Sequence, residues 1–159
     1  MASLEEDFRA FANAPTSVLD GALLVSRIVH ADTSEAWCRG ELRALSREVG
    51  EARNAASVLA MLRKTGFQGA EQYYDPDNSA LELVLRRKRG IPISLAAVTM
   101  GVCEALGLDA RGINFPGHFL VTIEGELVDP FLLQRVDDQE RDERILAAGV
   151  PAEQALREA

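Results

Sequence analysis

The sequence predicts an α+β domain in which a helical N-terminal layer precedes a buried central helix packed on a small antiparallel sheet. Residues 95–106 are apolar at almost every position, and a helix that is apolar all round belongs inside a domain, since this length cannot span a bilayer. After residue 109 the apolar positions alternate, as they do in half-buried strands. The 159 residues suit one domain, with a helical layer over 1–70, a core helix and sheet over 71–135, and a charged helical tail over 136–159.

The composition restricts the classes of function. A formal net charge of -8 argues against a nucleic-acid partner, and no apolar segment is long enough for a membrane span. The acidic N-terminus lacks the basic start of a signal peptide, so we expect a cytoplasmic protein. Cys38 and Cys103 are expected to be buried small hydrophobic residues, and their spacing from His30 and His118 matches no metal-binding pattern. No cofactor is expected, and the expected partner is a protein or peptide.

The first seventy residues follow helical spacing. Ser17 and Asp20 form a capping-box pattern at the start of a helix that ends at His30, where a charged imidazole would suit the helix dipole. Residues 32–34 offer caps for a second helix, and a third is expected over about 51–64. These amphipathic helices carry no recognisable chemistry, so we interpret them as a packing layer.

A turn and a short helix precede the central helix. Residues 75–79 have the alternating oxygens of a calcium loop, but the required glycine and glutamate are missing from its sixth and twelfth positions. Ser79 and Glu82 instead form a capping box for a helix expected to reach Arg89. The basic run at 86–89 is explained by its place at the C-terminus of that helix.

The start of the central helix carries the first candidate site residue. Gly90 and Pro92 are expected to exclude a helix from their own positions, which makes Ser94 the predicted N-cap of a helix over 95–106 that Gly107 closes. The positive backbone potential at a helix N-terminus favours anions and nucleophiles. Ser94 is therefore either a plain helix cap or a nucleophile.

Two further candidate residues lie in a predicted hairpin. Three strands are expected after the central helix, over 109–115, 118–123 and 126–129. A two-residue turn at 124–125 would set Leu120 opposite Asp129 and His118 opposite Phe131. His118 and Asp129 would then be diagonal neighbours on one face of the sheet, whereas a three-residue loop would place them on opposite faces.

The residues after the strands are heavily charged. Asp137 with Arg141 and Glu140 with Arg144 have the i,i+4 spacing of helical ion pairs. Residues 149–151 are expected to break this helix before a short alanine-rich one. We expect the whole tail to be solvated and to fray.

Several spaced motifs occur in one order between residues 71 and 131. They are Asp-Asn-Ser at 77–79, Arg-Gly-Ile-Pro-Ile-Ser-Leu at 89–95, Gly-Leu at 107–108, Gly-Ile-Asn-Phe-Pro-Gly-His-Phe-Leu at 112–120 and Asp-Pro-Phe at 129–131. This series resembles the SirB-type branch of the transglutaminase-like superfamily. The resemblance implies a papain-like arrangement, in which a nucleophile starts a central helix and an antiparallel sheet supplies a histidine and then an aspartate.

Carried over by position, the resemblance places the nucleophilic cysteine of the superfamily at Ser94, its histidine at His118 and its aspartate at Asp129. His118 would act as the base and Asp129 would hold the imidazole tautomer, in acyl transfer or amide hydrolysis. A serine hydroxyl gains less than a thiol from a helix terminus and a histidinium. Serine in this loop is also usual for the SirB-type branch.

Two hypotheses follow for the function. In the first, the domain keeps the transglutaminase-like architecture without catalysis and uses the former active-site cleft as a binding or regulatory module. In the alternative, it is a Ser-His-Asp acyltransferase or amide hydrolase acting on a protein or peptide substrate. A Ser94 hydroxyl bonded to His118 would favour the enzyme, and one bonded to the backbone N–H of Ala96 or Ala97 would favour the module.

Overall fold

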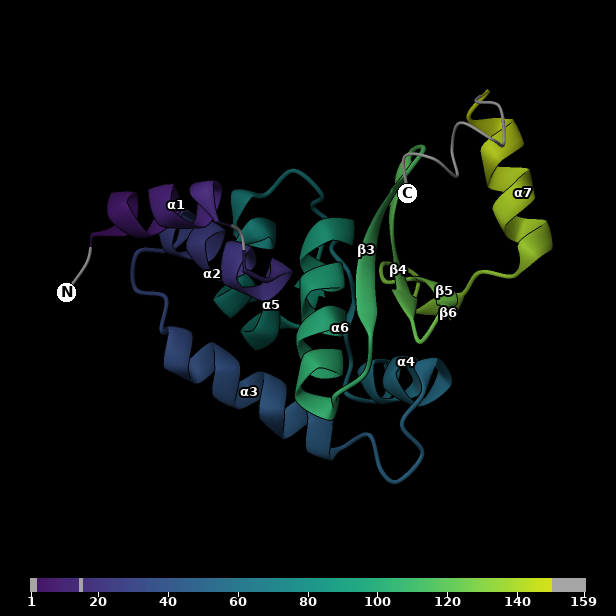
Figure 1. The fold of residues 1–159 in the computed structure, drawn as a ribbon, viewed down its shortest axis with the longest axis horizontal. Helices are drawn as coiled ribbons and strands as arrows, with labels where there is room; N and C mark the ends of the chain where they lie inside the picture. Colours follow the sequence, from purple (N-terminus) through teal and green to yellow (C-terminus); the bar gives the residue numbers. More distant parts are fainter. Residues whose placement is uncertain (1–2, 15, 150–159) are drawn as a thin grey trace.

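Helix α6 (Pro92–Leu106) lies at the centre of the fold, with a group of helices on one side and a β-sheet on the other (Figure 1). The computed structural model describes residues 3–14 and 16–149. The predicted α+β class, with a buried central helix on a small antiparallel sheet, is confirmed. In chain order the other elements are α1 (Leu4–Asn13), α2 (Val18–Val29), α3 (Glu35–Arg47), α4 (Ala55–Lys64), β1 (Gln68–Gly69), the 3₁₀ helix η1 (Pro76–Ser79), α5 (Leu81–Arg87), β2 (Arg89–Gly90), β3 (Ala110–Phe115), β4 (His118–Ile123), β5 (Glu126–Asp129), β6 (Gln134–Arg135) and α7 (Asp138–Ala147).

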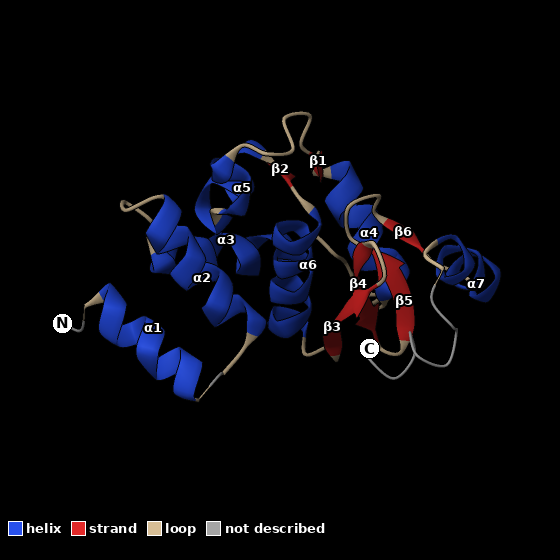
Figure 2. Ribbon diagram, turned by 90° about the horizontal axis from the view of Figure 1, so that it is seen from above, coloured by secondary structure: helices blue, strands red, loops and turns tan. Residues whose placement is uncertain are grey.

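Helices α1, α2, α3 and α5 lie on one side of α6, with α1 outermost on α2, whereas α4 lies on the side of the sheet (Figure 2). The side chains of Ser17, Ser34 and Asn54 cap α2, α3 and α4, each accepting a hydrogen bond from a backbone N–H of the first turn. The third predicted helix begins at Ala55 rather than near residue 51, because the cap is Asn54. Buried leucines and valines of these helices form one core with the apolar side chains of α6.

The sheet has the predicted register. Its four strands lie in the order β3-β4-β5-β6, and β4 pairs with β5 through Val121 with Val128 and Ile123 with Glu126. The two-residue turn between these strands has positive φ angles of 49° at Glu124 and 81° at its glycine, which is the geometry of a type I′ hairpin turn. The expected turn and strand pairing are therefore confirmed.

The segment before α6 differs from the prediction in two ways. Helix α5 begins after Ala80, which provides no side-chain cap, so the expected Ser79–Glu82 capping box is absent. The helix ends at Arg87 because Lys88 adopts a left-handed conformation with φ of 59°. The next two residues then form β2, which pairs in parallel with β1.

Helix α6 begins two residues before the expected cap. Ile91 is its N-cap and Pro92 its first residue, so the prediction of Ser94 as N-cap is wrong. Proline is well suited to the first turn of a helix, where its missing N–H has no acceptor to lose and its φ is already helical. Gly107 ends the helix in a left-handed conformation, as expected. None of the helices in the described ranges is long and apolar enough to cross a bilayer.

Helix α7 lies on the face of the sheet opposite α6 (Figures 1 and 2). Ile145 is 1% exposed and packs with Phe115 and Leu120. The Glu140–Arg144 pair forms as predicted, with 2.8 Å between Oε1 and NH2. The expectation of a solvated, fraying tail is wrong for this helix, because its buried isoleucine anchors it to the sheet. The predicted alanine-rich helix after residue 149 lies outside the described residues.

Candidate functional site

His118 and Asp129 line one small hollow. His118 is exposed at the start of β4, and Asp129 is buried at the end of β5. The hollow has a volume of about 160 Å³, and Pro92 and three apolar residues of the sheet and the following loop complete its lining. The register therefore brings the two predicted site residues to one place, although no hydrogen bond joins their side chains among the described residues.

Both oxygens of the Asp129 carboxylate are bound by groups other than His118. Its Oδ1 accepts hydrogen bonds from the backbone N–H groups of Phe131 and Leu132 at 2.9 and 3.0 Å. Its Oδ2 pairs with NH1 of Arg144 at 2.9 Å, and the two side chains are only 5% and 12% exposed. Burial acts to lower the pKa of Arg144, but its hydrogen bonds to Glu140 and Asp129 outweigh burial and raise the pKa. Arg144 thus stays charged and holds Asp129 from the side of α7.

Ser94 does not line the hollow that contains His118 and Asp129. Its hydroxyl accepts a hydrogen bond from the N–H of Ile91 at 3.0 Å and donates one to the Ile91 carbonyl at 3.2 Å. These two hydrogen bonds fix the first turn of α6, and Ser94 is only 6% exposed. Neither contact considered in the sequence analysis, to His118 or to the backbone of Ala96 and Ala97, is present.

Pro92 is the residue of α6 that lines the hollow shared by His118 and Asp129. Pro92 also lines a second hollow of about 360 Å³, together with Ile93 and His118. We call these two adjoining hollows the His118 groove; its lining residues are Tyr73, Ile91, Pro92, Ile93, Asn114, Phe115, Gly117, His118, Phe119, Asp129, Phe131 and Leu132. None of these side chains is a thiol or an aliphatic hydroxyl. The first residue of α6 in this groove is thus a proline, which has no nucleophilic side-chain atom.

The two cysteines offer no alternative nucleophile. Both are fully buried and free. Burial raises the pKa of the Cys38 thiol to about 11 and that of Cys103 to about 12, with the charge of Glu82 adding to the effect on Cys38. A thiol with so high a pKa stays protonated and unreactive at neutral pH.

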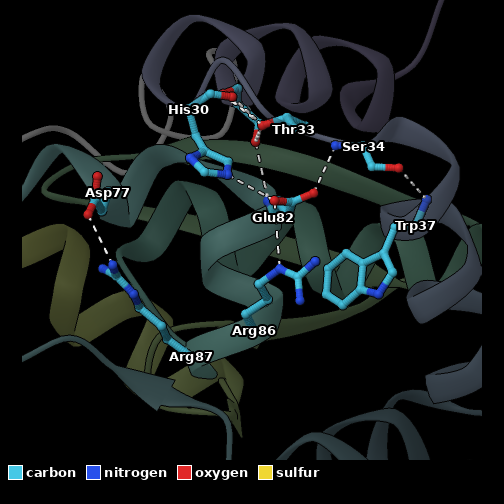
Figure 3. A network of polar contacts seen from close by, with 9 residues as sticks. His30, Thr33, Ser34, Trp37, Asp77, Glu82, Arg86 and Arg87 are labelled. Atoms are coloured by element: carbon cyan, nitrogen blue, oxygen red, sulfur yellow. Dashed lines mark hydrogen bonds and ion pairs between the residues drawn. The ribbon is translucent and has the colours of Figure 1, made fainter.

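A second polar cluster lies in the helical layer, centred on the buried Glu82 (Figure 3). Its carboxylate contacts His30 Nε2 at 3.0 Å, accepts the N–H of Ser34 at 2.8 Å, and lies 3.6 Å from the guanidinium of Arg86. Arg86 in turn stacks on Trp37, with 3.9 Å between its Cζ and the ring centroid. Glu82 therefore ties α2, α3 and α5 together, a role that its sequence position as a capping residue did not indicate.

No group of three or more metal-ligating side chains gathers within the part of the chain that the structure describes. His30 belongs to the Glu82 cluster, and His118 lies in the groove on the other side of α6. The four residues weighed in the sequence as a metal site do not come together.

Comparison with known proteins places the chain in a family. The family model described as the transglutaminase-like superfamily matches residues 30–158. The chain belongs to the transglutaminase-like superfamily. The superfamily resemblance drawn from the spaced motifs is thereby confirmed, and the match covers the sheet together with α3 and α4 but begins after α1 and α2. No solved structure matches the chain significantly.

The similar curated proteins include members named UPF0162. One from Xylella fastidiosa (strain 9a5c) is 42% identical over 111 residues, which are 64% of this chain and 40% of the relative. One from Vibrio cholerae is 33% identical over 129 residues, 75% of this chain and 46% of the relative. F-box only protein 21 of Mus musculus is 38% identical over 63 residues, 37% of this chain and 10% of the relative. The chain thus spans less than half the length of these relatives.

Proposed function

We propose that this transglutaminase-like domain is a non-catalytic binding module that holds a protein or peptide segment in the His118 groove. The observation that carries the proposal is the residue at the start of α6: Pro92, which has no nucleophilic atom, is the helix residue beside His118. The candidate nucleophile Ser94 has its hydroxyl engaged by Ile91, and Asp129 is engaged by Arg144 rather than by the imidazole. Ser94, His118 and Asp129 are therefore present, but no hydrogen bonds link their side chains into a triad.

The rim of the His118 groove supports binding of a peptide. Tyr73, Ile93 and Leu132 line it and are each about half exposed, at 47%, 54% and 51%. Large apolar side chains gathered around a hollow are typical of interaction sites. Asn114 and His118 add exposed hydrogen-bonding groups to the same groove, which could orient the backbone or a polar side chain of the bound segment.

Covalent labelling tests the absence of catalysis. We expect a fluorophosphonate probe not to label the wild-type protein, and an iodoacetamide probe not to label Ser94→Cys faster than an ordinary buried thiol. Pro92→Cys, in contrast, would place a thiol at a helix N-terminus beside His118, where the thiolate is favoured. We expect Pro92→Cys to be alkylated several-fold faster at pH 7 than the same variant carrying His118→Ala.

The contrary result would be labelling of the wild-type protein at Ser94 that is lost in His118→Ala. That result would refute the binding module and establish the Ser-His-Asp hydrolase or acyltransferase instead.

Peptide display tests binding directly. Peptides selected on the wild-type protein should lose at least tenfold in affinity when Tyr73 or Leu132 is replaced by alanine. Leu146→Ala provides a matched control, since this side chain is 78% exposed on α7 and does not line the groove. Selected peptides that bind all three variants equally would show that the groove is not the binding site.

A further inference from the structure

A larger hollow lies on the opposite side of the α6 start, between α1, α2 and the first turns of α6. Its volume is about 530 Å³, which falls within the range of small-molecule sites. Phe8 and Phe11 of α1 line one wall, Val25 of α2 the second, and Ile93 and Ala97 of α6 the third. We call this hollow the α1 cavity.

The chemistry of the α1 cavity is almost wholly apolar. No ionisable side chain belongs to its lining, and the polar side chains among the lining residues are Ser79 and Ser94. The Ser94 hydroxyl is already bonded to Ile91. The Ser79 hydroxyl makes no hydrogen bond with any described residue, so it can bond to a ligand. A hollow of this kind does not hold ordered water well, since water needs two or more polar partners.

The position of α1 decides which class of occupant fits. Helix α1 already lies over α2, held by an ion pair of 2.7 Å between Asp7 and Arg27. It approaches closely at Gly21, where an added Cβ would lie 2.9 Å from the ring of Phe11. Helix α1 is therefore a wall of the cavity that is already in place, and the volume beside it suits a small molecule.

We propose that the α1 cavity binds an uncharged, hydrocarbon-rich small molecule, with the Ser79 hydroxyl as its hydrogen-bonding partner. This site is distinct from the His118 groove, although Ile93 lines both. An alkyl chain would gain free energy by leaving water for the aromatic and aliphatic walls. A carboxylate or ammonium group would lose its hydration there without finding a counter-charge.

Titration with N-phenyl-1-naphthylamine, an uncharged apolar dye, tests the proposal on the wild-type protein. We expect saturable fluorescence enhancement with one site per chain. 1-Decanol should displace the dye at least tenfold more effectively than decanoate at pH 8, because the lining offers a hydroxyl and no cation. Absence of saturable binding, or displacement by decanoate at equal concentration, would overturn the proposal.

Two filling variants locate the site. Ala97→Leu and Ala22→Phe each add volume inside the cavity from a different helix, and each should weaken dye binding at least tenfold. Ala105→Leu makes the same change as Ala97→Leu on the same helix but does not line the cavity, so it should bind the dye like wild type. If circular dichroism shows that one filling variant does not fold, the other variant and the competition with decanol still test the proposed site. Unchanged binding in a folded filling variant, or dye bound only between two chains in sedimentation, would refute the assignment.

Discussion

Replacement of Arg144 by methionine should destabilise the domain by removing the partner of a buried carboxylate. The methionine keeps most of the apolar stem of the arginine, so the loss reports the charge rather than the packing. The Asp129 side chain is 5% exposed and would keep only its two backbone N–H bonds. Breaking one side of a buried ion pair costs roughly 3–5 kcal/mol.

The two remaining N–H bonds and the partial exposure of Arg144 place the expected loss at the lower end, about 3 kcal/mol. For a domain of this size that loss corresponds to a fall in Tm of roughly 6–12 °C. Urea unfolding at pH 7, followed by the fluorescence of the single tryptophan, Trp37, measures it.

Arg141→Met provides the matched control on the same helix. Among the residues that the structure describes, Arg141 pairs only with the exposed carboxylates of Asp138 and Asp142, and such surface pairs contribute less than about 1 kcal/mol. In a double-mutant cycle, Arg144→Met should cost much less in a background of Asp129→Asn, where no charge is left to be compensated. If Arg144→Met cost no more than Arg141→Met, the buried pair would not hold α7 to the sheet.

Three further outcomes are expected from the protonation states and buried polar groups. Cys38 and Cys103, with thiol pKa values raised by burial to about 11 and about 12, should resist iodoacetamide at pH 7.5 in the native protein and react in urea; mass spectrometry showing rapid native labelling would contradict this. Glu82→Ala should lower the free energy of urea unfolding by about 2–4 kcal/mol, because His30, Ser34 and Arg86 each lose a polar partner. A loss no larger than that of His30→Ala would argue against Glu82 as the centre of the cluster. The Thr16 hydroxyl and the Arg39 guanidinium lower the pKa of Asp20 against the opposing effect of burial. The stabilisation from the ionised Asp20 is therefore present at neutral pH and is lost as the pH falls below the ordinary aspartate pKa of about 3.9. The stability difference between wild type and Asp20→Asn should shrink between pH 4 and pH 2, and a constant difference would refute the assignment.

Local chemistry explains which features could be predicted from the sequence. The turn at Glu124 and Gly125 is specified by its own two residues, and the alternation of the strands then fixes the register. The shared hollow of His118 and Asp129 follows from that register, so the placement of these two of the three candidate residues could be predicted without a structure. The apolar run of α6 likewise needs only its own composition to be placed in the core.

The remaining features depend on contacts that span long stretches of the chain. A proline predicts the end of a helix in the interior but is favoured at the first helical position, so the sequence pattern places the cap at Ser94 whereas the structure has it at Ile91. The ion pair from Arg144 to Asp129 crosses from α7 to the sheet, and the i,i+4 pattern explains Arg144 through Glu140 alone. The left-handed Lys88 that ends α5 carries no sequence signal such as glycine.

The shallow attachment of α1 has a consequence for the local stability of this helix. None of the described side chains of α1 is fully buried, and the helix packs chiefly on α2. Elements with so little buried surface open locally at a small fraction of the global unfolding free energy. Amide hydrogens of α1 should therefore exchange with deuterium long before those of α6. A ligand of the α1 cavity that packs on Phe8 and Phe11 would slow hydrogen exchange in α1 selectively.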